Sequence, residues 1–162
     1  MKLEEEIQQS RFRNDYQKAI LNIMYTGNWM ENRLKRFFSE VNQVQSITLQ
    51  QYNILRILNG RYPATASVND LKDRMLDPVS DVSRIVERLR KQGLLSREVC
   101  PSDRRAVDVK ITEQGRALID QLDAYNPQMD EILGHLTPNE LALLNQLLDK
   151  VRERTLPCDL EK

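Results

Sequence analysis

The spacing of apolar residues changes at Gly93, and this change restricts the fold more than any other feature of the chain. Before Gly93, four apolar residues recur at steps of three and one, which places them on one face of a helix. They are Val82, Ile85, Val86 and Leu89. After Gly93, apolar and polar residues alternate in two runs, 95–99 and 107–111, joined by a loop. The sequence therefore predicts a helix followed directly by a β-hairpin.

Two shorter helices are predicted before this one. Residues 48–51 form a capping box, in which a Thr hydroxyl and a Gln side chain satisfy backbone N–H groups at a helix start. Residues 67–70 indicate the start of a second, short helix. The third helix is predicted over 78–92, with Asp77 as its N-cap and Pro78 at the first helical position, where the missing N–H costs nothing. Helix, turn, helix and hairpin together outline a winged helix-turn-helix domain.

Long helices are predicted on both sides of this domain. Residues 7–44 contain no proline and carry apolar side chains at steps near three and four, with Gly27 as a candidate bend. Beyond the hairpin, Thr112 is predicted to cap a helix that Pro127 interrupts, and a last helix follows Thr137. The predicted fold is mainly α with a small β-hairpin. Its parts are an N-terminal helix over 1–46, a winged helix-turn-helix domain over 47–112 and C-terminal helices over 113–162.

The formal net charge is zero, because 24 Lys and Arg residues balance 24 Asp and Glu residues. The balance differs along the chain. Basic residues exceed acidic ones by twelve to eight over 47–112, whereas acidic residues exceed basic ones by ten to five over 113–162. Such asymmetry favours a surface for a polyanion. Between Arg84 and Arg105 there are seven basic residues against three acidic ones, so we expect DNA to lie there.

Composition excludes several classes of function. His135 is the only histidine, and Cys100 and Cys158 lie far apart, so the ordinary zinc ligand sets cannot be assembled. The sequence has neither a Gly-rich phosphate loop nor a G-x-S-x-G motif, and we therefore expect no enzymatic activity and no cofactor. An acidic start and the lack of a long apolar segment predict a cytoplasmic protein without a membrane partner.

The residues around the predicted helix and hairpin carry a family signature. Its members are Val82, Arg84, Val86, Leu89, Gly93, Leu94, Leu95 and Arg97, then Asp103, Arg104 and Arg105, then Ile111, Thr112, Gly115 and Leu118. In this order and spacing they resemble the multiple antibiotic resistance regulator (MarR) family of bacterial and archaeal transcription factors, most strongly over 47–122. The resemblance implies a homodimer, held by the helices of 1–46 and 113–162, that binds a pseudo-palindromic operator. It also implies a repressor released by a small molecule or an oxidant.

Helix 78–92 is then expected in the major groove, whose width of about 12 Å admits one helix. The hairpin tip, or wing, is expected in the adjacent minor groove, whose negative potential attracts arginine. The candidate DNA contacts of the helix are Ser80, Asp81, Ser83, Arg84 and Arg88, and those of the wing are Asp103, Arg104 and Arg105.

Some of these residues have alternative roles that do not involve DNA. Arg84 has Glu87 and Asp81 as alternative partners on a solvated helix face, and Asp103 fits a role in holding the wing loop. Asp81 stands where the family has a small hydroxyl residue. Its carboxylate can accept a hydrogen bond from cytosine but is repelled by phosphate, so it either specifies the site or weakens binding.

An effector pocket is a further hypothesis. Tyr25, Trp29 and Tyr52 are candidates to line a pocket for a small aromatic or phenolic molecule, against the alternative that they form dimer core and internal packing. Cys100 lies near wing arginines that favour a reactive thiolate, although the alternative is an ordinary cysteine. The rival overall function is a winged-helix ligand-binding or scaffold protein that does not bind DNA.

Overall fold

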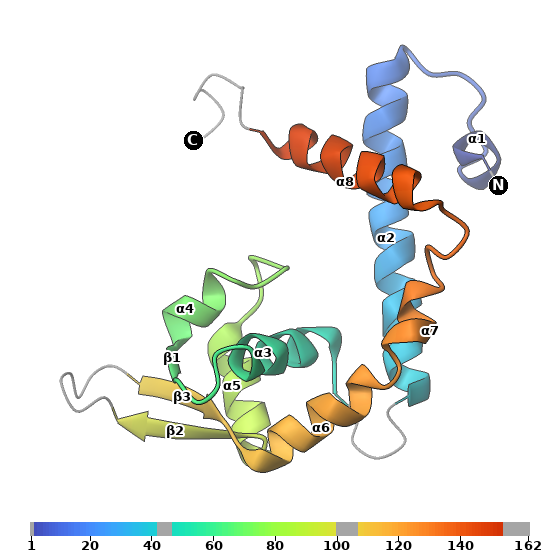
Figure 1. The fold of residues 1–162 in the computed structure, drawn as a ribbon. Coiled ribbons are helices and arrows are strands. Elements are labelled where there is room, and N and C mark those ends of the chain that lie inside the picture. Colours follow the sequence, from blue (N-terminus) through green and yellow to red (C-terminus); the bar gives the residue numbers. More distant parts are fainter. Residues whose placement is uncertain (1, 42–46, 100–106, 154–162) are drawn as a thin grey trace, which may run out of the picture. The chain divides into compact units, whose positions relative to one another are not determined.

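The computed structural model describes residues 2–41, 47–99 and 107–153, and it divides into two compact units, Met1–Tyr125 and Asn126–Lys162 (Figure 1). The first unit contains a three-stranded antiparallel sheet in the order β1-β3-β2 among its described residues. The elements in chain order are α1 Leu3–Glu6, α2 Asp15–Val41, α3 Leu49–Asn59, β1 Ala66–Ser67, α4 Val68–Lys72, α5 Val82–Lys91, β2 Leu95–Val99, β3 Val107–Ile111, α6 Glu113–Asp123, α7 Asn126–Asp130 and α8 Pro138–Arg152.

The predicted β-hairpin is confirmed. Strands β2 and β3 pair antiparallel, with Leu95 opposite Ile111 and Arg97 opposite Val109. The short strand β1 pairs with the other edge of β3 and was not predicted, since two residues are too few to give an alternating pattern. In Figure 1 the β2–β3 ribbon lies beside α5, so the helix and the base of the hairpin form one structural unit.

The core of the winged helix-turn-helix domain joins the apolar faces of α3, α4, α5, β3 and α6. Its largest fully buried side chains are Ile54, Leu55, Leu58, Leu71, Leu89, Leu94, Ile119, Val86 and Val109. Complete burial of a side chain of this size contributes roughly 1.5–3 kcal/mol. The core thus fixes α5 and the hairpin relative to α3 and α6, and with them the surface that α5 presents to solvent.

Four helix starts predicted from capping residues are confirmed. The side chains of Thr48, Ser67, Thr112 and Thr137 each accept a hydrogen bond from the backbone N–H group three residues later. Each bond satisfies one of the N–H groups that lack a partner in the first turn of a helix. Helices α3, α4, α6 and α8 therefore begin where the sequence places their N-caps.

The predicted start of the third helix is wrong. Helix α5 begins at Val82 with Asp81 as its N-cap, and not at Pro78 with Asp77 as its N-cap. The carboxylate of Asp77 instead accepts hydrogen bonds from the N–H of Val79, at 3.0 Å, and from the hydroxyl of Ser80, at 2.9 Å. These bonds close a separate turn before the helix.

Three details of the flanking helices also differ from the sequence-based expectation. Helix α2 begins at Asp15 and continues without interruption through Gly27. Residues 7–14, which the prediction included in this helix, form no helix, and the short helix α1 at Leu3–Glu6 precedes them. Helix α6 ends at Asp123, and the residues around Pro127 form the separate five-residue helix α7.

Helix α1 is tied to α2 by two polar contacts. The ammonium group of Lys18 lies 2.6 Å from Glu4, and the Tyr25 hydroxyl donates to Glu6 at 2.5 Å.

Among the described helices, none combines the length with the hydropathy that crossing a bilayer requires.

Candidate nucleic-acid interface

Helix α5 has a buried face and an exposed face. Val82, Val86 and Leu89 are buried in the core. Each residue of a helix is rotated by about 100° from the one before. Arg84 and Lys91, two and nine positions after Val82, therefore point away from this core. The exposed polar positions are Ser83, Arg84, Arg88, Arg90 and Lys91. A helix anchored on one side, with cations on the other, has the form needed to enter a groove of DNA.

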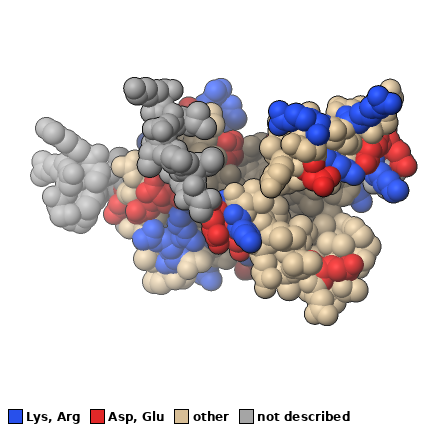
Figure 2. Space-filling view, turned by 90° about the horizontal axis from the view of Figure 1, so that it is seen from above, with Lys and Arg blue, Asp and Glu red and all other residues tan. Residues whose placement is uncertain are grey.

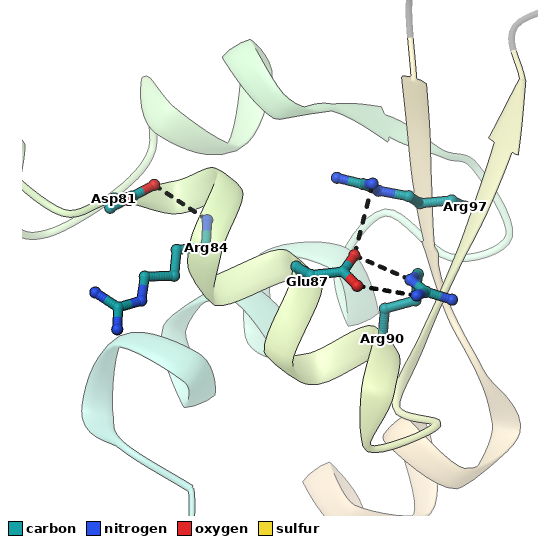
Figure 3. A network of polar contacts seen from close by, with 5 residues as sticks. All are labelled: Asp81, Arg84, Glu87, Arg90 and Arg97. Atoms are coloured by element: carbon teal, nitrogen blue, oxygen red, sulfur yellow. Dashed lines mark hydrogen bonds and ion pairs between the residues drawn. The ribbon is translucent and has the colours of Figure 1, made fainter.

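Asp81 stabilises the start of this helix. Its side chain accepts a hydrogen bond from the backbone N–H of Arg84 at 3.1 Å, as Figure 3 shows. A carboxylate at this position also interacts favourably with the positive end of the helix dipole. From the sequence, Asp81 was considered as a DNA contact, as an obstacle to binding or as an ion-pair partner of Arg84, whereas the structure gives it a capping role within the helix.

Glu87 lies at the centre of a network of ion pairs. Its carboxylate accepts hydrogen bonds from Arg90 at 2.9 and 3.0 Å and lies 3.6 Å from the guanidinium group of Arg97 on β2 (Figure 3). These arginines hold the pKa of the Glu87 carboxyl below its usual range, Arg90 contributing most. The hydrogen bond from Arg90 likewise raises the pKa of that guanidinium group.

The guanidinium group of Arg84 points away from this network in Figure 3. Within the described part of the chain it forms neither an ion pair nor a side-chain hydrogen bond. The two alternative partners considered from the sequence are both occupied, Glu87 by Arg90 and Arg97, and Asp81 by the backbone of residue 84. Arg84 is therefore available for a ligand.

The remaining candidate contacts differ in their placement. Ser83 and Arg88 lie exposed on α5, whereas Ser80 is half-buried in the turn before the helix and donates its hydroxyl hydrogen to Asp77. The hydroxyl of Ser80 is thus bonded within the turn, whereas the side chains of Ser83 and Arg88 face solvent on α5. The predicted wing contacts Asp103, Arg104 and Arg105, together with Cys100, lie outside the described residues.

Charged side chains of both signs lie beside one another on the face shown in Figure 2. The ion pairs of the first unit include Arg56 with Asp123 and Arg61 with Asp70. Among the described residues, no three His, Cys, Asp or Glu side chains are grouped to hold a metal ion. Among the cations of α5, Arg90 is paired with Glu87, whereas Arg84, Arg88 and Lys91 form no ion pair within the described residues.

The structure does not bring together the three residues proposed for an effector pocket. Tyr25 and Trp29 line a hollow of about 330 Å³ on α2, together with Asn28, Asn32, Arg33 and Arg36. Tyr52 lies instead on α3, half-buried, with its ring centroid 4.9 Å from that of Phe38. The hydrogen bond to Glu6 raises the pKa of Tyr25, while burial raises the pKa of Tyr52. Tyr52 belongs to the packing between α2 and α3.

A second hollow, of about 420 Å³, lies between α2, α3 and the segment that precedes α5. Its lining residues are Glu31, Leu49, Gln50, Asn53, Met75, Leu76 and Asp77. This hollow was not predicted from the sequence, because its walls come from three separate segments. The exposed Leu76, which the helical pattern around 67–75 does not account for, is the one local signal in the sequence.

Comparison with known proteins identifies the family. The sequence model of the MarR family matches residues 45–106. A MarR transcription factor from Planctomyces limnophilus, of known crystal structure, is 32% identical in sequence, with a TM-score of 0.64, and the match covers 86% of this chain and 98% of that one. The chain belongs to the MarR family. The fold predicted from the sequence, a winged helix-turn-helix domain with helices at both ends, is confirmed.

Two other solved structures resemble this chain. A mutant of MarR from E. coli, complexed with operator DNA, is 26% identical with a TM-score of 0.73, and the match covers 88% of this chain and 99% of that one. BpsR from Bordetella bronchiseptica, whose DNA binding is regulated by 6-hydroxynicotinic acid, is 26% identical with a TM-score of 0.67, covering 81% and 93% respectively.

Proposed function

We propose that this MarR-family chain is a transcriptional regulator that binds a pseudo-palindromic operator as a homodimer and represses transcription until a small molecule binds. The observation that carries the proposal is the exposed face of α5. There Arg84, Arg88 and Lys91 have no ion-pair partner among the described residues. The opposite face of the helix is buried in the core, which keeps these cations directed to solvent.

Arg84 is the residue we assign to base recognition. A free guanidinium group near the start of a recognition helix can donate two hydrogen bonds to the O6 and N7 atoms of guanine. Arg88 and Lys91 lie further along the helix and suit phosphate oxygens, and the wing arginines Arg104 and Arg105 are proposed for the minor groove. Base contacts supply sequence preference, whereas phosphate contacts supply affinity that depends on salt.

The homodimer is proposed from apolar side chains that neither unit buries. On α2 they are Tyr16, Ile20, Ile23, Met24 and Trp29, and on α8 they are Leu143, Leu144, Leu147 and Val151. Exposed apolar residues at helical spacing favour association with another helix. Two copies would present two α5 helices, which must meet half-sites about one turn of DNA apart, or about 34 Å.

The effector is proposed to be a small aromatic anion held in the hollow on α2. The rings of Tyr25 and Trp29 offer stacking surfaces, and Arg33 and Arg36 offer positive charge on the same helix. An occupant there would alter the surface of a helix to which we assign dimer contacts, and so the spacing of the two α5 helices. Tyr52 is not part of this proposal.

The first test is binding to a duplex from the upstream region of the protein's own gene, followed by fluorescence anisotropy. Affinity should fall steeply as salt rises, and a scrambled duplex should bind much more weakly. Affinity that is weak and indifferent to salt would contradict the proposal and favour a ligand-binding or scaffold protein instead.

Arg84→Ala should weaken operator binding by roughly 1–3 kcal/mol and relax the preference at one base position. Arg152→Ala, which removes an exposed arginine from α8, is the matched control and should leave the base preference unchanged. An equal loss on all sequences would make Arg84 a phosphate contact and not a base contact.

Trp29 is the only tryptophan of the chain, so its intrinsic fluorescence reports directly on the hollow on α2. Titration with 6-hydroxynicotinic acid or salicylate should change this fluorescence and weaken operator binding over the same concentration range. Arg33→Ala should shift both curves together. Release of DNA without a change in Trp29 fluorescence would place the effector elsewhere.

A further inference from the structure

Glu87 is an acidic residue on the same exposed side of α5 as the cations assigned to DNA. It lies three residues after Arg84 and four before Lys91, and residues three and four apart are neighbours on a helix surface. A carboxylate here faces the phosphates that the cations would approach, and it repels them. Its presence on this side of the helix requires an explanation.

The geometry shows what Glu87 does in the unbound protein. Both of its oxygens accept hydrogen bonds from Arg90, Oε1 from Nη2 at 2.9 Å and Oε2 from Nε at 3.0 Å. Oε2 also lies 3.6 Å from the Nη1 atom of Arg97, which belongs to a different element, β2. One carboxylate thus holds two guanidinium groups, one by a bidentate pair. A glutamate is already ionised at neutral pH, and the lowered pKa of Glu87 keeps it ionised to more acidic pH as well.

We propose that Glu87 limits the binding of DNA of any sequence by holding Arg90 and Arg97 away from the phosphates. This inference rests on the proposed function, since it concerns the same surface. Arg84, Arg88 and Lys91 remain for DNA, while Arg90 and Arg97 are kept by Glu87 in the ion pairs of Figure 3. Because a genome offers a very large excess of competing sites, a low affinity for random sequence is what allows a regulator to find its operator.

The competing explanation is that Glu87 only attaches β2 to α5. The two explanations predict opposite changes in the affinity for random-sequence DNA when the Glu87 carboxylate is removed. A structural attachment, when removed, should loosen the DNA-binding surface and weaken binding to every duplex. Removal of a group that holds two cations should strengthen binding to random DNA and make it more sensitive to salt.

The test is Glu87→Gln, which keeps the size and shape of the side chain and removes its charge. Affinity for a random-sequence duplex is measured by anisotropy between roughly 0.05 and 0.3 M salt. Each released arginine that reaches a phosphate should steepen the slope of log affinity against log salt by about 0.9. For two arginines the slope steepens by about 1.8, which corresponds to about 60-fold tighter binding at 0.1 M relative to a 1 M reference.

Asp149→Asn is the matched control. Asp149 also forms an ion pair with an arginine three residues later, Arg152, on the exposed helix α8, and its substitution raises the net charge by the same single unit. It should change random-duplex affinity by less than about twofold, because it releases no cation near α5. An effect equal to that of Glu87→Gln would attribute the change to net charge and overturn the inference.

A second variant tests the inference without altering Glu87. If Arg90 and Arg97 are withheld from DNA, Arg90→Gln combined with Arg97→Gln should weaken random-duplex affinity only by the few-fold that the unpaired Glu87 carboxylate then costs near the phosphates. A loss of about 60-fold would show that both arginines already bind phosphates, and the inference would fail. In this doubly substituted background, Glu87→Gln should have lost most of its effect.

The operator duplex is measured in parallel, so that the two proposals are separated. If the wild-type protein shows no preference for the operator over random DNA, the proposed function fails, while the random-duplex result still decides the role of Glu87. If the preference is present but Glu87→Gln binds random DNA no more tightly than the wild type, only the inference about Glu87 fails.

Discussion

Adding one methyl group at Gly115 should destabilise the winged helix-turn-helix domain. A Cβ atom at Gly115 would lie 2.3 Å from the carbonyl oxygen of Leu94 and 2.8 Å from the Cγ1 atom of Ile111. The first contact is with backbone, which cannot rotate away as a side chain can. The same Leu94 carbonyl accepts the hydrogen bond of the Thr112 N–H at 3.1 Å, so displacing it weakens that bond as well.

The magnitude follows from these two contacts. Overpacking of a well-packed site costs typically 1–3 kcal/mol, and one backbone hydrogen bond contributes about 1 kcal/mol. The higher helix propensity of alanine returns at most about 1 kcal/mol. We therefore expect Gly115→Ala to lower the free energy of unfolding by about 2–3 kcal/mol.

Urea unfolding followed by circular dichroism, at one fixed protein concentration, measures this change. With an m value of about 2 kcal/mol/M, the midpoint should fall by about 1–1.5 M. Gly27→Ala is the control, since the same methyl group on α2 meets nothing within 4 Å. It should raise stability by up to about 1 kcal/mol. If Gly115→Ala unfolds at or above the wild-type midpoint, the close packing of α6 against Leu94 is refuted.

Three further predictions concern polar side chains of the first unit. Arg56 and Asp123 join α3 to α6 by two hydrogen bonds of 2.8 and 2.9 Å, and their side chains are 48% and 32% exposed. Because solvent screens an ion pair this exposed, a double-mutant cycle on urea stability should give a coupling of only about 0.5–1 kcal/mol. Asp81→Ala should lose about 1 kcal/mol of stability with its cap, measured in urea, while binding random DNA more tightly because a carboxylate near the phosphates is gone. Hydrogen bonds from Ser67 lower the pKa of Asp70, so its stabilising effect is present at neutral pH and is lost as pH falls through the lowered pKa. The urea midpoints of wild type and Asp70→Asn should differ at pH 7 and converge as the pH falls through that lowered pKa.

Helix starts could be predicted where the decisive contact is local. Thr48, Ser67, Thr112 and Thr137 each cap through a bond to a residue three positions later, so the sequence alone contains both partners. The hairpin was equally accessible, because its two alternating runs are each five residues long. Such short-range patterns were sufficient for the winged helix-turn-helix fold.

The start of α5 could not be predicted in the same way, because the sequence offers two aspartates, Asp77 and Asp81, as the N-cap of this helix. Asp77 precedes a proline, which favours a helix start, but its carboxylate bonds to Val79 and Ser80 and forms a turn. Asp81, four residues later, then caps the helix. The sequence contains both signals and does not indicate which N-cap is used.

The ion pairs of the candidate interface depend on contacts between separate elements. Glu87 was considered from the sequence as a partner of Arg84, three positions earlier. In the structure it pairs with Arg90, equally close in sequence, and with Arg97, which β2 brings near only once the hairpin has folded. The hollow between α2, α3 and the segment before α5 was inaccessible for the same reason.

The separation of buried and exposed positions on α5 has a consequence for how such a regulator can diversify. Val82, Val86 and Leu89 carry the packing, whereas Ser83, Arg84 and Arg88 contribute little to it. Substitutions at exposed positions usually change stability by less than about 0.5 kcal/mol. A gene duplicate could therefore exchange these outer side chains for others, and acquire a different operator, while inheriting an intact fold.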